Sequence, residues 1–503
     1  MAVRGFLGID AGTQGLSVVL TDESLNVVAT GDGGYEMCKG LEEGCYEQDP
    51  NDWVSALTAA MADLKNKLAG QGDSELDIMG VGISGQMHGE VLVGEDQSPL
   101  KSARLWCDAR NDAEGHELTS ALNVKMPKRI TLARWLWTLR NQPDVAKKVW
   151  RMTTPGGWLA FCLTGQFNLG VGDAAGMFPI DQSTMDYDDV LLEKFDSIAA
   201  AHQPPASLRD LLPSVKVAGE DGGTLNESGS RILGLPVGIP VAPAEGDQPA
   251  SMAGSLIGNA GMVSVSFGTS VCANSIGDKR FAGVSDAVDH FCAPDGKPIN
   301  MVWLRNGTTY MNTTVEMFGK MNESDNPFES VMPQVVAAEP DCGGMLALPF
   351  MDDEPGLGVS EGGTAGLFNI NAQNATPGNA VKAAMLATMF NLRIGSEVLD
   401  RQGFPRDELV LSGGLTRTPE LGQVLADVMN TRVTLFAGAD EGCAWGAALM
   451  AKYRVSNGGQ TWEAFLQTLA NAMTEDATRF DPDQDAVKTY NDVYLRYQEL
   501  LKR

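Results

Sequence analysis

The chain has 503 residues, of which 43% are hydrophobic and 20% are charged. Single hydrophobic cores stop growing near ~250 to 300 residues, so this composition and length predict a globular protein with two domains. The net charge of −28 repels nucleic-acid phosphates and anionic lipid surfaces. We therefore expect neither nucleic acid nor membrane as a partner.

The sequence carries no sign of export. No segment approaches the ~18 uninterrupted apolar residues of a membrane span, and MAVRGFLGID lacks the apolar core of a signal peptide. The eight cysteines stand singly, with no CxxC pair, which predicts reduced thiols. A cytoplasmic location follows, and there a sequon such as Asn306-Gly307-Thr308 has no meaning for glycosylation.

The first half begins with a strand, a glycine-rich turn and a second strand. Its pattern predicts two strands, a helix and a third strand over residues 6–10, 16–21, 52–68 and 77–84. Asn51 or Asp52 would cap the helix. Residues 235–254, LPVGIPVAPAEGDQPASMAG, are dense in Pro, Gly and Ala, so we expect a hinge there.

The second half repeats the opening plan. Residues 261–276 read again as an apolar strand, a Gly-Thr turn and an apolar strand. The pattern then predicts helices over 378–401, 418–430 and 443–453 and strands over 408–414 and 432–436. Strands that alternate with helices indicate an α/β layer architecture.

Three nucleotide and nucleophile motifs can be set aside. GVGISG at 80–85 fits the dinucleotide string but lies inside an apolar strand. GVSEG at 358–362 fits the nucleophile elbow, yet no strand precedes it, so we expect a surface loop. No GxxxxGK[ST] occurs, so a nucleotide site here is not of the P-loop type.

The turn DAGTQG has two interpretations. A single copy is most simply a β-hairpin with glycines at positive φ. The second Gly-Thr turn at 268–269 favours a pair of bends whose N–H groups and hydroxyls grip phosphate, with Asp10 able to hold Mg²⁺. His88 and Asp247 stay open at this point between a functional role and an ordinary solvated position.

With these pieces in order, the chain resembles the FGGY family of carbohydrate kinases from about Phe6 to Ala451. VGISGQMHG, EQDP at 47–50, LWCDAR at 105–110 and LTGQFNLGVGDAAG at 163–176 look most like the xylulokinases within it. The resemblance implies an α/β fold with two actin-like, ribonuclease H-like ATPase domains and an interdomain cleft. It implies a sugar-binding and phosphate-motif domain over 1–248 and a nucleotide-binding domain over 249–503.

The same resemblance implies roles for individual residues. The implied ATP contacts are Gly12, Thr13, Gln14, Gly268, Thr269, Ser270, Gly413 and Gly414. The implied sugar contacts are Gln86, Met87, His88, Trp106, Asp108, Asp247 and Gln248. Asp247 matches the family's general base, and Asp10 would hold Mg²⁺.

Four departures from the family pattern are visible. AEGDQ stands where GGGDN is usual, so Gln248 replaces an Asn that touches sugar and would shift or shrink the pocket. Arg134 stands for a signature Lys, and Leu415 for a glycine at the adenine platform. Residues 351–358, MDDEPGLG, replace an ERTP-type loop.

The implied activity is ATP-dependent phosphorylation of a small sugar. D-xylulose, giving D-xylulose 5-phosphate, is the first expectation, with another pentulose, a polyol or a hydroxyketone as alternatives. An actin-like ATPase switch and a sugar sensor without kinase activity are two further classes. SGQMHG and Asp247 argue against the switch, and the sequence leaves a homodimer open.

Overall fold

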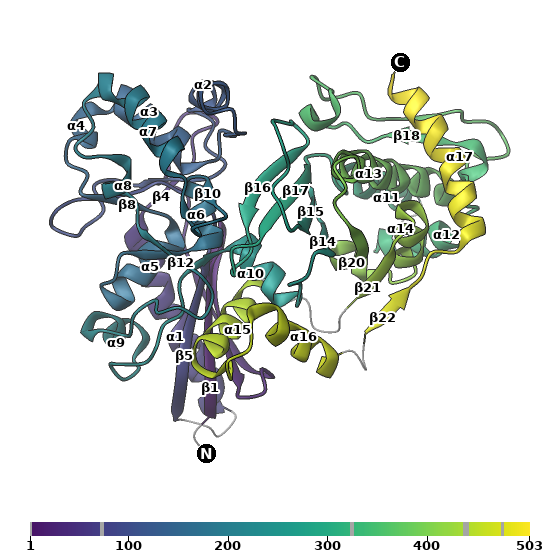
Figure 1. Cartoon of the computed structure of the whole chain (residues 1–503). Coiled ribbons are helices and arrows are strands. Elements are labelled where there is room, and N and C mark those ends of the chain that lie inside the picture. The colour runs from purple at the N-terminus through teal and green to yellow at the C-terminus, as the bar shows by residue number, and fades with distance from the viewer. Residues whose placement is uncertain (1–2, 71–74, 322–325, 436–441, 474–476, 503) are drawn as a thin grey trace. The chain divides into compact units, whose positions relative to one another are not determined.

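The computed structural model describes residues 3–70, 75–321, 326–435, 442–473 and 477–502. The chain packs into two compact units (Figure 1). The first unit comprises Met1–Gly258, Phe291–Pro298 and Glu441–Ala470, and the second Asn259–His290, Ile299–Asp440 and Asn471–Arg503. The domain boundary expected at residues 248 and 249 stays a prediction. Among the described residues, no helix is both long and apolar enough to cross a bilayer.

The elements alternate between strands and helices along most of the chain, which confirms the α/β class. The strands are β1 (Val3–Ala11), β2 (Gly15–Asp22), β3 (Val27–Gly34), β4 (Glu47–Gln48), β5 (Leu76–Gly85), β6 (Val91–Val93), β7 (Ala103–Arg104), β8 (Arg151–Thr153), β9 (Asn168–Gly170), β10 (Ile180–Asp181), β11 (Asp186–Tyr187), β12 (Ser214–Lys216), β13 (Glu245–Gly246), β14 (Gly261–Phe267), β15 (Val271–Ile276), β16 (Val288–Cys292), β17 (Pro298–Leu304), β18 (Leu346–Leu348), β19 (Gly366–Phe368), β20 (Arg406–Gly413), β21 (Arg432–Leu435) and β22 (Thr478–Phe480). The α-helices are α1 (Pro50–Gly70), α2 (Asp112–Leu122), α3 (Thr131–Asn141), α4 (Pro143–Ala146), α5 (Pro155–Thr164), α6 (Val171–Met177), α7 (Asp189–Ala199), α8 (Leu208–Leu211), α9 (Glu227–Leu233), α10 (Asp247–Gly254), α11 (Thr309–Met321), α12 (Pro327–Ala337), α13 (Pro377–Asp400), α14 (Leu421–Met429), α15 (Gly442–Ser456), α16 (Trp462–Met473) and α17 (Gln484–Leu501). Short 3₁₀ turns are η1 (Ala200–His202), η2 (Cys342–Gly344), η3 (Pro355–Leu357) and η4 (Gly414–Arg417).

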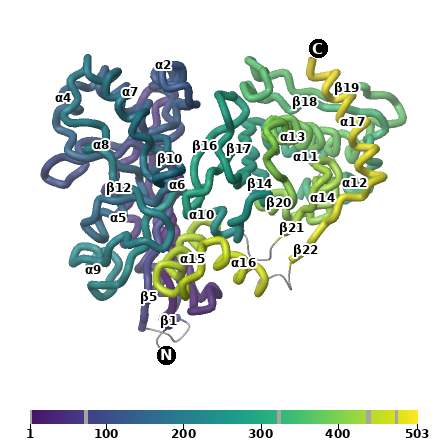
Figure 2. The backbone as a smooth tube through the Cα atoms, in the orientation of Figure 1, coloured from purple at the N-terminus to yellow at the C-terminus, as the bar shows by residue number. Residues whose placement is uncertain are grey.

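The first unit is built on a sheet with the order β13-β5-β1-β2-β3. Helix α15 lies beside β1 and β5 although it comes late in the chain (Figure 2). A Cβ on Gly8 would lie 1.9 Å from a carbonyl oxygen of α15, and one on Gly31 would lie 2.2 Å from a carbonyl oxygen of α1. Gly8 pairs with Val19 and Gly31 with Val18, and adjacent residues of a strand face opposite ways. The two helices therefore cover opposite faces of this sheet.

The second unit repeats the same strand plan in a sheet with the order β16-β17-β15-β14-β20-β21-β22. Strand β14 is antiparallel to β15 and parallel to β20, just as β1 is antiparallel to β2 and parallel to β5. Helix α13 is buried on most of its surface and belongs to the core cluster of this unit. The repeat expected at 261–276 is thus confirmed as β14, a turn and β15.

Two local expectations were wrong. Helix α1 begins at Pro50, and the Asp49 carboxylate accepts the N–H of Asn51 at 2.9 Å, so neither Asn51 nor Asp52 is the cap. Proline suits the first helical position because its missing N–H would have no partner there. Residues 245–254 of the segment expected as a hinge form strand β13 and helix α10, so Asp247 lies on a helix and not in a flexible loop. A hinge movement of residues 235–254 stays a prediction.

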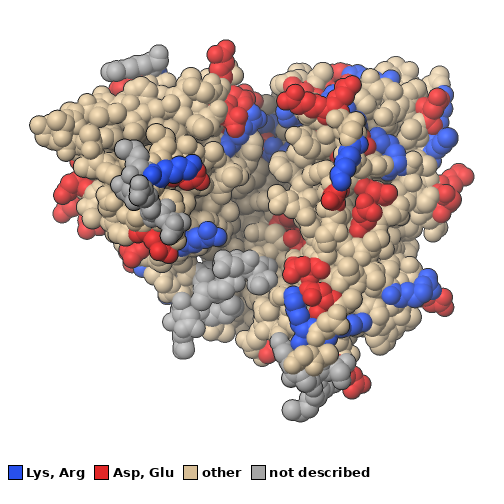
Figure 3. Space-filling model, turned by 180° about the vertical axis from the view of Figure 1, so that it is seen from behind, with Lys and Arg blue, Asp and Glu red and all other residues tan. Residues whose placement is uncertain are grey.

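Charged side chains of both signs share the molecular surface. On the face drawn in Figure 3, basic side chains stand in small groups, mostly next to acidic ones. Among the ion pairs of the chain, Arg432 and Asp481 form an exposed one, with 2.7 Å between Nε and Oδ1. This face therefore offers no continuous basic band of the kind that follows a nucleic-acid backbone.

Candidate active site

Three predicted site segments of the first unit meet where parallel strands end. Asp10 on β1 pairs in register with Ser84 on β5, and Ser84 pairs with Glu245 on β13. The Ser84 hydroxyl donates to Asp10 Oδ1 at 2.9 Å. Ligands of open α/β sheets bind beyond the carboxyl ends of such strands. The sheet therefore brings the predicted IDAGT, SGQMHG and EGDQ segments to one edge.

The turn after β1 is held by hydrogen bonds to residues predicted to contact the sugar. The Thr13 hydroxyl lies 3.2 Å from Gln86 Oε1 and accepts the indole N–H of Trp106 at 3.0 Å. Gln48, from the EQDP stretch, donates to the Thr13 carbonyl at 2.9 Å and accepts from Gln86 Nε2 at 2.9 Å. The predicted phosphate turn and the predicted sugar contacts thus form one hydrogen-bonded network.

A tyrosine that the sequence analysis did not single out fixes the same turn. The Tyr35 hydroxyl, just past the end of β3, donates to the carbonyls of Gly12 and Gly15, the latter at 2.9 Å. Burial, together with the charge of Asp10, raises the pKa of Tyr35, so the hydroxyl keeps its proton. Gln14, predicted to contact ATP, lies exposed at the tip of the turn.

Met87 and His88 lie against the segment that carries Asp247. A Cβ on Gly246 would fall 2.3 Å from Met87 Cγ, so the methionine packs directly on the backbone before Asp247. His88 has a left-handed backbone with φ of 67°, and its Nδ1 lies 2.8 Å from the Gly176 carbonyl. Because a carbonyl only accepts, Nδ1 carries the hydrogen of this bond.

Arg134 holds the backbone of His88 through a hydrogen bond. Its Nη1 donates to the main-chain carbonyl of His88 at 3.2 Å and also to the Arg129 carbonyl. The Thr131 hydroxyl donates to the same His88 oxygen at 3.1 Å. The guanidinium is buried, and this burial lowers the pKa of Arg134 to about 9. The arginine that replaces the expected lysine therefore contacts the backbone of His88, a predicted sugar contact.

Asp247 is the first residue of α10. Burial, together with the charge of Asp10, raises the pKa of Asp247 to about 7. Cys443 on α15 donates its thiol to the Asp247 main-chain carbonyl at 3.3 Å. Burial and the charges of both carboxylates raise the pKa of Cys443. Asp10 and Asp247 therefore share one electrostatic environment.

Two buried acids beside Asp247 were missed. Glu245 is 2% exposed and accepts the N–H groups of Gly172 at 3.3 Å and Asp173 at 2.9 Å. Asp173 accepts from the Thr154 hydroxyl at 2.5 Å, and burial raises the pKa of both acids to about 8. The replacement of GGGDN by AEGDQ contained the signal for Glu245, but nothing local in the sequence indicated that its carboxyl group turns inward.

Asp108, predicted to line the sugar pocket, has its carboxylate engaged by protein. It is fully buried, accepts from Arg110 Nε at 3.0 Å and accepts the Tyr46 N–H at 2.9 Å. Burial alone would raise the pKa of Asp108, but these hydrogen bonds hold it below its usual value. Trp106, two residues earlier, is 40% exposed. Asp108 thus anchors the turn that presents Trp106, and its direct contact with sugar stays a prediction.

The second unit carries its own exposed turn between β14 and β15. Gly268 and Thr269 are exposed, and the Gly268 N–H donates to the Ser270 carbonyl at 2.9 Å. Register places Phe267, just before this turn, opposite Gly413 at the end of β20. The predicted phosphate and adenosine residues of this unit therefore lie on neighbouring strand ends.

Gly413 and Leu415 show how the predicted adenosine segment is built. Gly413 has φ of 82°, and a Cβ there would lie 2.5 Å from the Phe267 carbonyl oxygen, so only glycine fits. Leu415 is 3% exposed and belongs to the core of the second unit. The Leu415 side chain therefore packs in the core. The sequence instead predicts an altered adenine platform.

A metal would need ligands beyond those of the protein. Among the described residues, no group of three or more His, Cys, Asp or Glu side chains could hold an ion. Mg²⁺ commonly uses one or two carboxylates together with waters and substrate phosphates. A single carboxylate such as Asp10, held by the Ser84 hydroxyl at 2.9 Å, fits that kind of shared site.

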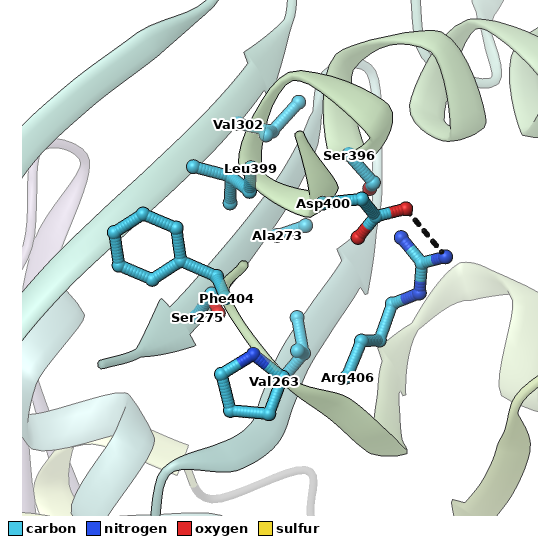
Figure 4. A pocket seen from close by; sticks show the side chains of 10 residues that line it. Val263, Ala273, Ser275, Val302, Ser396, Leu399, Asp400, Phe404 and Arg406 are labelled. Atoms are coloured by element: carbon cyan, nitrogen blue, oxygen red, sulfur yellow. Dashed lines mark ion pairs between the residues drawn. The ribbon is translucent and has the colours of Figure 1, made fainter. Parts of the chain in front are cut away.

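The hollow drawn in Figure 4 lies elsewhere, under the C-terminal end of α13. Val263, Val302 and Phe404 line it, and Arg406 pairs with Asp400 at 3.0 Å beside it. It has space for no more than about one water. The hollow is therefore a packing defect of the core and too small for a nucleotide or a sugar.

Solved structures share this architecture over nearly the whole chain. A xyloylose kinase from Brucella ovis matches with a TM-score of 0.83, 22% identity and 98% coverage of each chain. Glycerol kinase from Plasmodium falciparum with ADP matches with a TM-score of 0.82, 19% identity and coverage of 99% and 98%. The fold is that of two-domain sugar kinases with actin-like, ribonuclease H-like ATPase domains, as predicted.

The chain belongs to the FGGY family of carbohydrate kinases, whose N-terminal domain matches residues 6–254 and whose C-terminal domain matches residues 263–455. It is an ATP-dependent sugar kinase. Xylulose kinase of Haemophilus influenzae is 26% identical over 506 residues, covering 98% of each chain. Xylulose kinase of Escherichia coli is 26% identical over 511 residues, covering 99% of this chain and 100% of the relative.

Proposed function

We propose that the enzyme phosphorylates D-xylulose to D-xylulose 5-phosphate, with Asp247 as general base. The observation that carries this proposal is the position of Asp247 at the head of α10, next to the Met87–His88 corner and with a pKa raised to about 7. A base is most effective when its pKa lies near the working pH. A carboxylate in open solvent would titrate about three pH units lower.

In the proposed reaction, the ionised Asp247 accepts the proton of the sugar's primary hydroxyl as its oxygen attacks the γ-phosphorus of ATP. The new bond joins the sugar oxygen to phosphorus, the bond to the β,γ-bridging oxygen breaks, and ADP leaves. Phosphoryl transfer depends chiefly on positioning and charge stabilisation. Backbone N–H groups of the turns at 12–14 and 268–270 are proposed to supply part of that stabilisation.

Asp10 is the residue proposed to hold Mg²⁺, directly or through water. The ion would neutralise phosphate charge, which this strongly acidic chain does not supply through its own net charge of −28. Ser84 orients the Asp10 carboxylate through its hydroxyl at 2.9 Å. Gly413 and Gly414, exposed at the end of β20, are proposed to lie against the adenosine.

The choice of D-xylulose rests on the xylulose kinases among the relatives and on the hydrogen bonds of Glu245. Solved structures of a similar fold include a gluconate kinase and a glycerol kinase, so the fold alone does not select the sugar. Glu245, the bulky replacement in AEGDQ, hydrogen-bonds to the N–H groups of Gly172 and Asp173, which argues that its carboxyl group is not a sugar ligand. Gln248 is the remaining change that would favour another pentulose, a polyol or a hydroxyketone.

A coupled assay of ADP release against D-xylulose, L-xylulose, D-ribulose, L-ribulose, glycerol and gluconate tests the proposal. We expect the highest kcat/KM with D-xylulose, and phosphorus NMR should place the phosphate on C5. ATP hydrolysis that needs no sugar would favour an ATPase switch. Binding of sugar without any ADP release would favour a sensor. A cytoplasmic location and a homodimer stay predictions.

A further inference from the structure

Glu354 is a buried acid in the loop at 351–358, which replaces the ERTP-type loop. It is 1% exposed, and its carboxylate accepts three hydrogen bonds. These come from the main-chain N–H of Arg305 at 3.1 Å, the main-chain N–H of Asn306 at 2.9 Å and the Asn306 side-chain amide at 3.1 Å. Such charge-assisted bonds are roughly twice as strong as neutral ones. A carboxylate of the loop thus occupies a nest of N–H groups at the end of β17.

Asn306 binds the same loop in the opposite direction. Its side-chain amide donates to the carbonyls of Asp352 at 3.0 Å and Asp353 at 3.2 Å, and its carbonyl accepts the Asp352 N–H at 2.9 Å. Arg305 adds an ion pair with Asp353. The loop and residues 305–306 therefore hydrogen-bond to each other in both directions, so a shift of one should shift the other.

The next two residues of this segment hold the turn between β14 and β15. The Gly307 N–H donates to the Thr269 carbonyl at 2.9 Å, and the N–H and hydroxyl of Thr308 both donate to the Gly268 carbonyl at 2.9 Å. A Cβ on Gly307 would fall 2.5 Å from the Gly268 oxygen, so the two backbones are in direct contact. The Asn306-Gly307-Thr308 sequon is thus a buried connector between the loop and the turn.

We propose that Glu354 is a positioning residue for ATP: it fixes the turn at 268–270 through residues 305–308 and so sets the affinity for the nucleotide phosphates. This inference rests on the proposed role of that turn. Glu354 acts on the turn only through residues 305–308. Its effect on ATP is indirect and should leave sugar binding unchanged.

The chemistry requires a carboxylate in this nest. Three donors point at its two oxygens, and glutamine would present one amide group to a donor in place of an acceptor. A buried donor left without its acceptor is costly, so the segment at 305–308 would shift to find another partner. A displacement of the turn by a fraction of an ångström is enough to weaken phosphate contacts.

The test compares Glu354→Gln, Glu354→Asp and the matched control Asp352→Asn, which neutralises an exposed carboxylate two residues away. Steady-state kinetics give separate KM values for ATP and sugar, and calorimetry measures ADP affinity without sugar. We expect the KM for ATP to rise about tenfold in Glu354→Gln and less in Glu354→Asp, with the sugar KM within about twofold. ADP affinity should weaken in the same order, and Asp352→Asn should match the parent enzyme.

Thr269→Glu separates the two levels of the proposal, because it places a negative charge on the exposed turn itself. A large rise in its KM for ATP, with an unchanged KM in both Glu354 variants, would overturn the role of Glu354 alone. An unchanged KM for ATP in Thr269→Glu would overturn the proposed function of the turn and Glu354's role with it. Should Glu354→Gln fail to fold, Glu354→Asp decides through ADP affinity. Parent-like affinity in that variant would refute the positioning role.

Discussion

Arg134 donates a hydrogen bond from Nη1 to the main-chain oxygen of His88 at 3.2 Å. His88 has a left-handed φ of 67°, a conformation that costs roughly 1–2 kcal/mol for a residue with a Cβ. Thr131 donates to the same oxygen at 3.1 Å. Two donors on one carbonyl therefore hold the backbone that aims the imidazole.

Arg134→Met should weaken sugar binding because it removes the stronger, charged donor and lets the His88 backbone relax. We expect the KM for sugar to rise about tenfold while the KM for ATP stays within about twofold. Arg134→Lys keeps a cation and should lie between parent and Met variant. Thr131→Val, which deletes the neutral donor, serves as the matched control with a smaller effect. Equal changes in both KM values would make Arg134 a general packing residue.

Asp247→Asn tests the general base with almost no change of shape. The amide cannot accept the hydroxyl proton as a carboxylate does, so kcat should fall by about 10²- to 10⁴-fold. ATP affinity should stay within a few fold, measured by calorimetry with ADP. Asp247→Ala should behave in the same way. Parent-like turnover in either variant would remove Asp247 from the mechanism.

The pH profile follows from the same carboxylate. The proposed base would act in its ionised form, and the pKa of Asp247 is raised to about 7, so activity should rise with pH and level off above that value. Asp10 on β1, Asp173 on α6 and Cys443 on α15 are the titratable groups that share its field. Bound Mg²⁺ would favour the anion and lower the pKa. The rise of kcat with pH should therefore lie at lower pH than the rise of kcat/KM for the first substrate. A profile that is flat from pH 5 to 8 would contradict the proposed role of Asp247 as general base.

Close packing of the first sheet gives a prediction about stability. A Cβ on Gly82 would lie 1.8 Å from the Ala447 carbonyl oxygen in α15, and backbone cannot move aside cheaply. Gly82→Ala should therefore cost about 3 kcal/mol or more of the free energy of unfolding. Gly34→Ala, where nothing lies within 4 Å, should stay within about 0.5 kcal/mol. Urea denaturation of both variants compares them, and equal midpoints would show that α15 does not rest on this sheet.

Local patterns predicted most of the fold. Alternating apolar residues and Gly-Thr pairs depend on neighbours in sequence, and β1, β2, β14 and β15 lie where that pattern placed them. Residues 245–254 differ from the expected flexible loop because Pro and Gly also occur where a short strand meets a helix in tight packing. Composition alone does not distinguish that case from a flexible linker.

The site was less accessible to the sequence because its supports are long-range. Glu354 contacts residues 48 and 49 positions earlier, and Glu245 contacts residues 72 and 73 positions earlier. A carboxylate looks the same in sequence whether it is solvated or buried in a nest of N–H groups. Motifs identified Asp10, His88 and Asp247 as candidates. The raised pKa values of the two acids and the left-handed backbone of His88 emerge only from packing.

Trp106 offers a test of the hydrogen-bonded network between the predicted phosphate turn and the predicted sugar contacts. Its indole N–H donates to the Thr13 hydroxyl at 3.0 Å, and its ring is 40% exposed. Trp106→Phe keeps an aromatic surface but deletes the donor, so the KM for ATP should rise about threefold to tenfold while the KM for sugar changes little. Trp106→Ala also removes the ring and should raise both values. If the Phe variant raised only the sugar KM, Thr13 would not depend on the indole, and the network would not couple the phosphate turn to the sugar side.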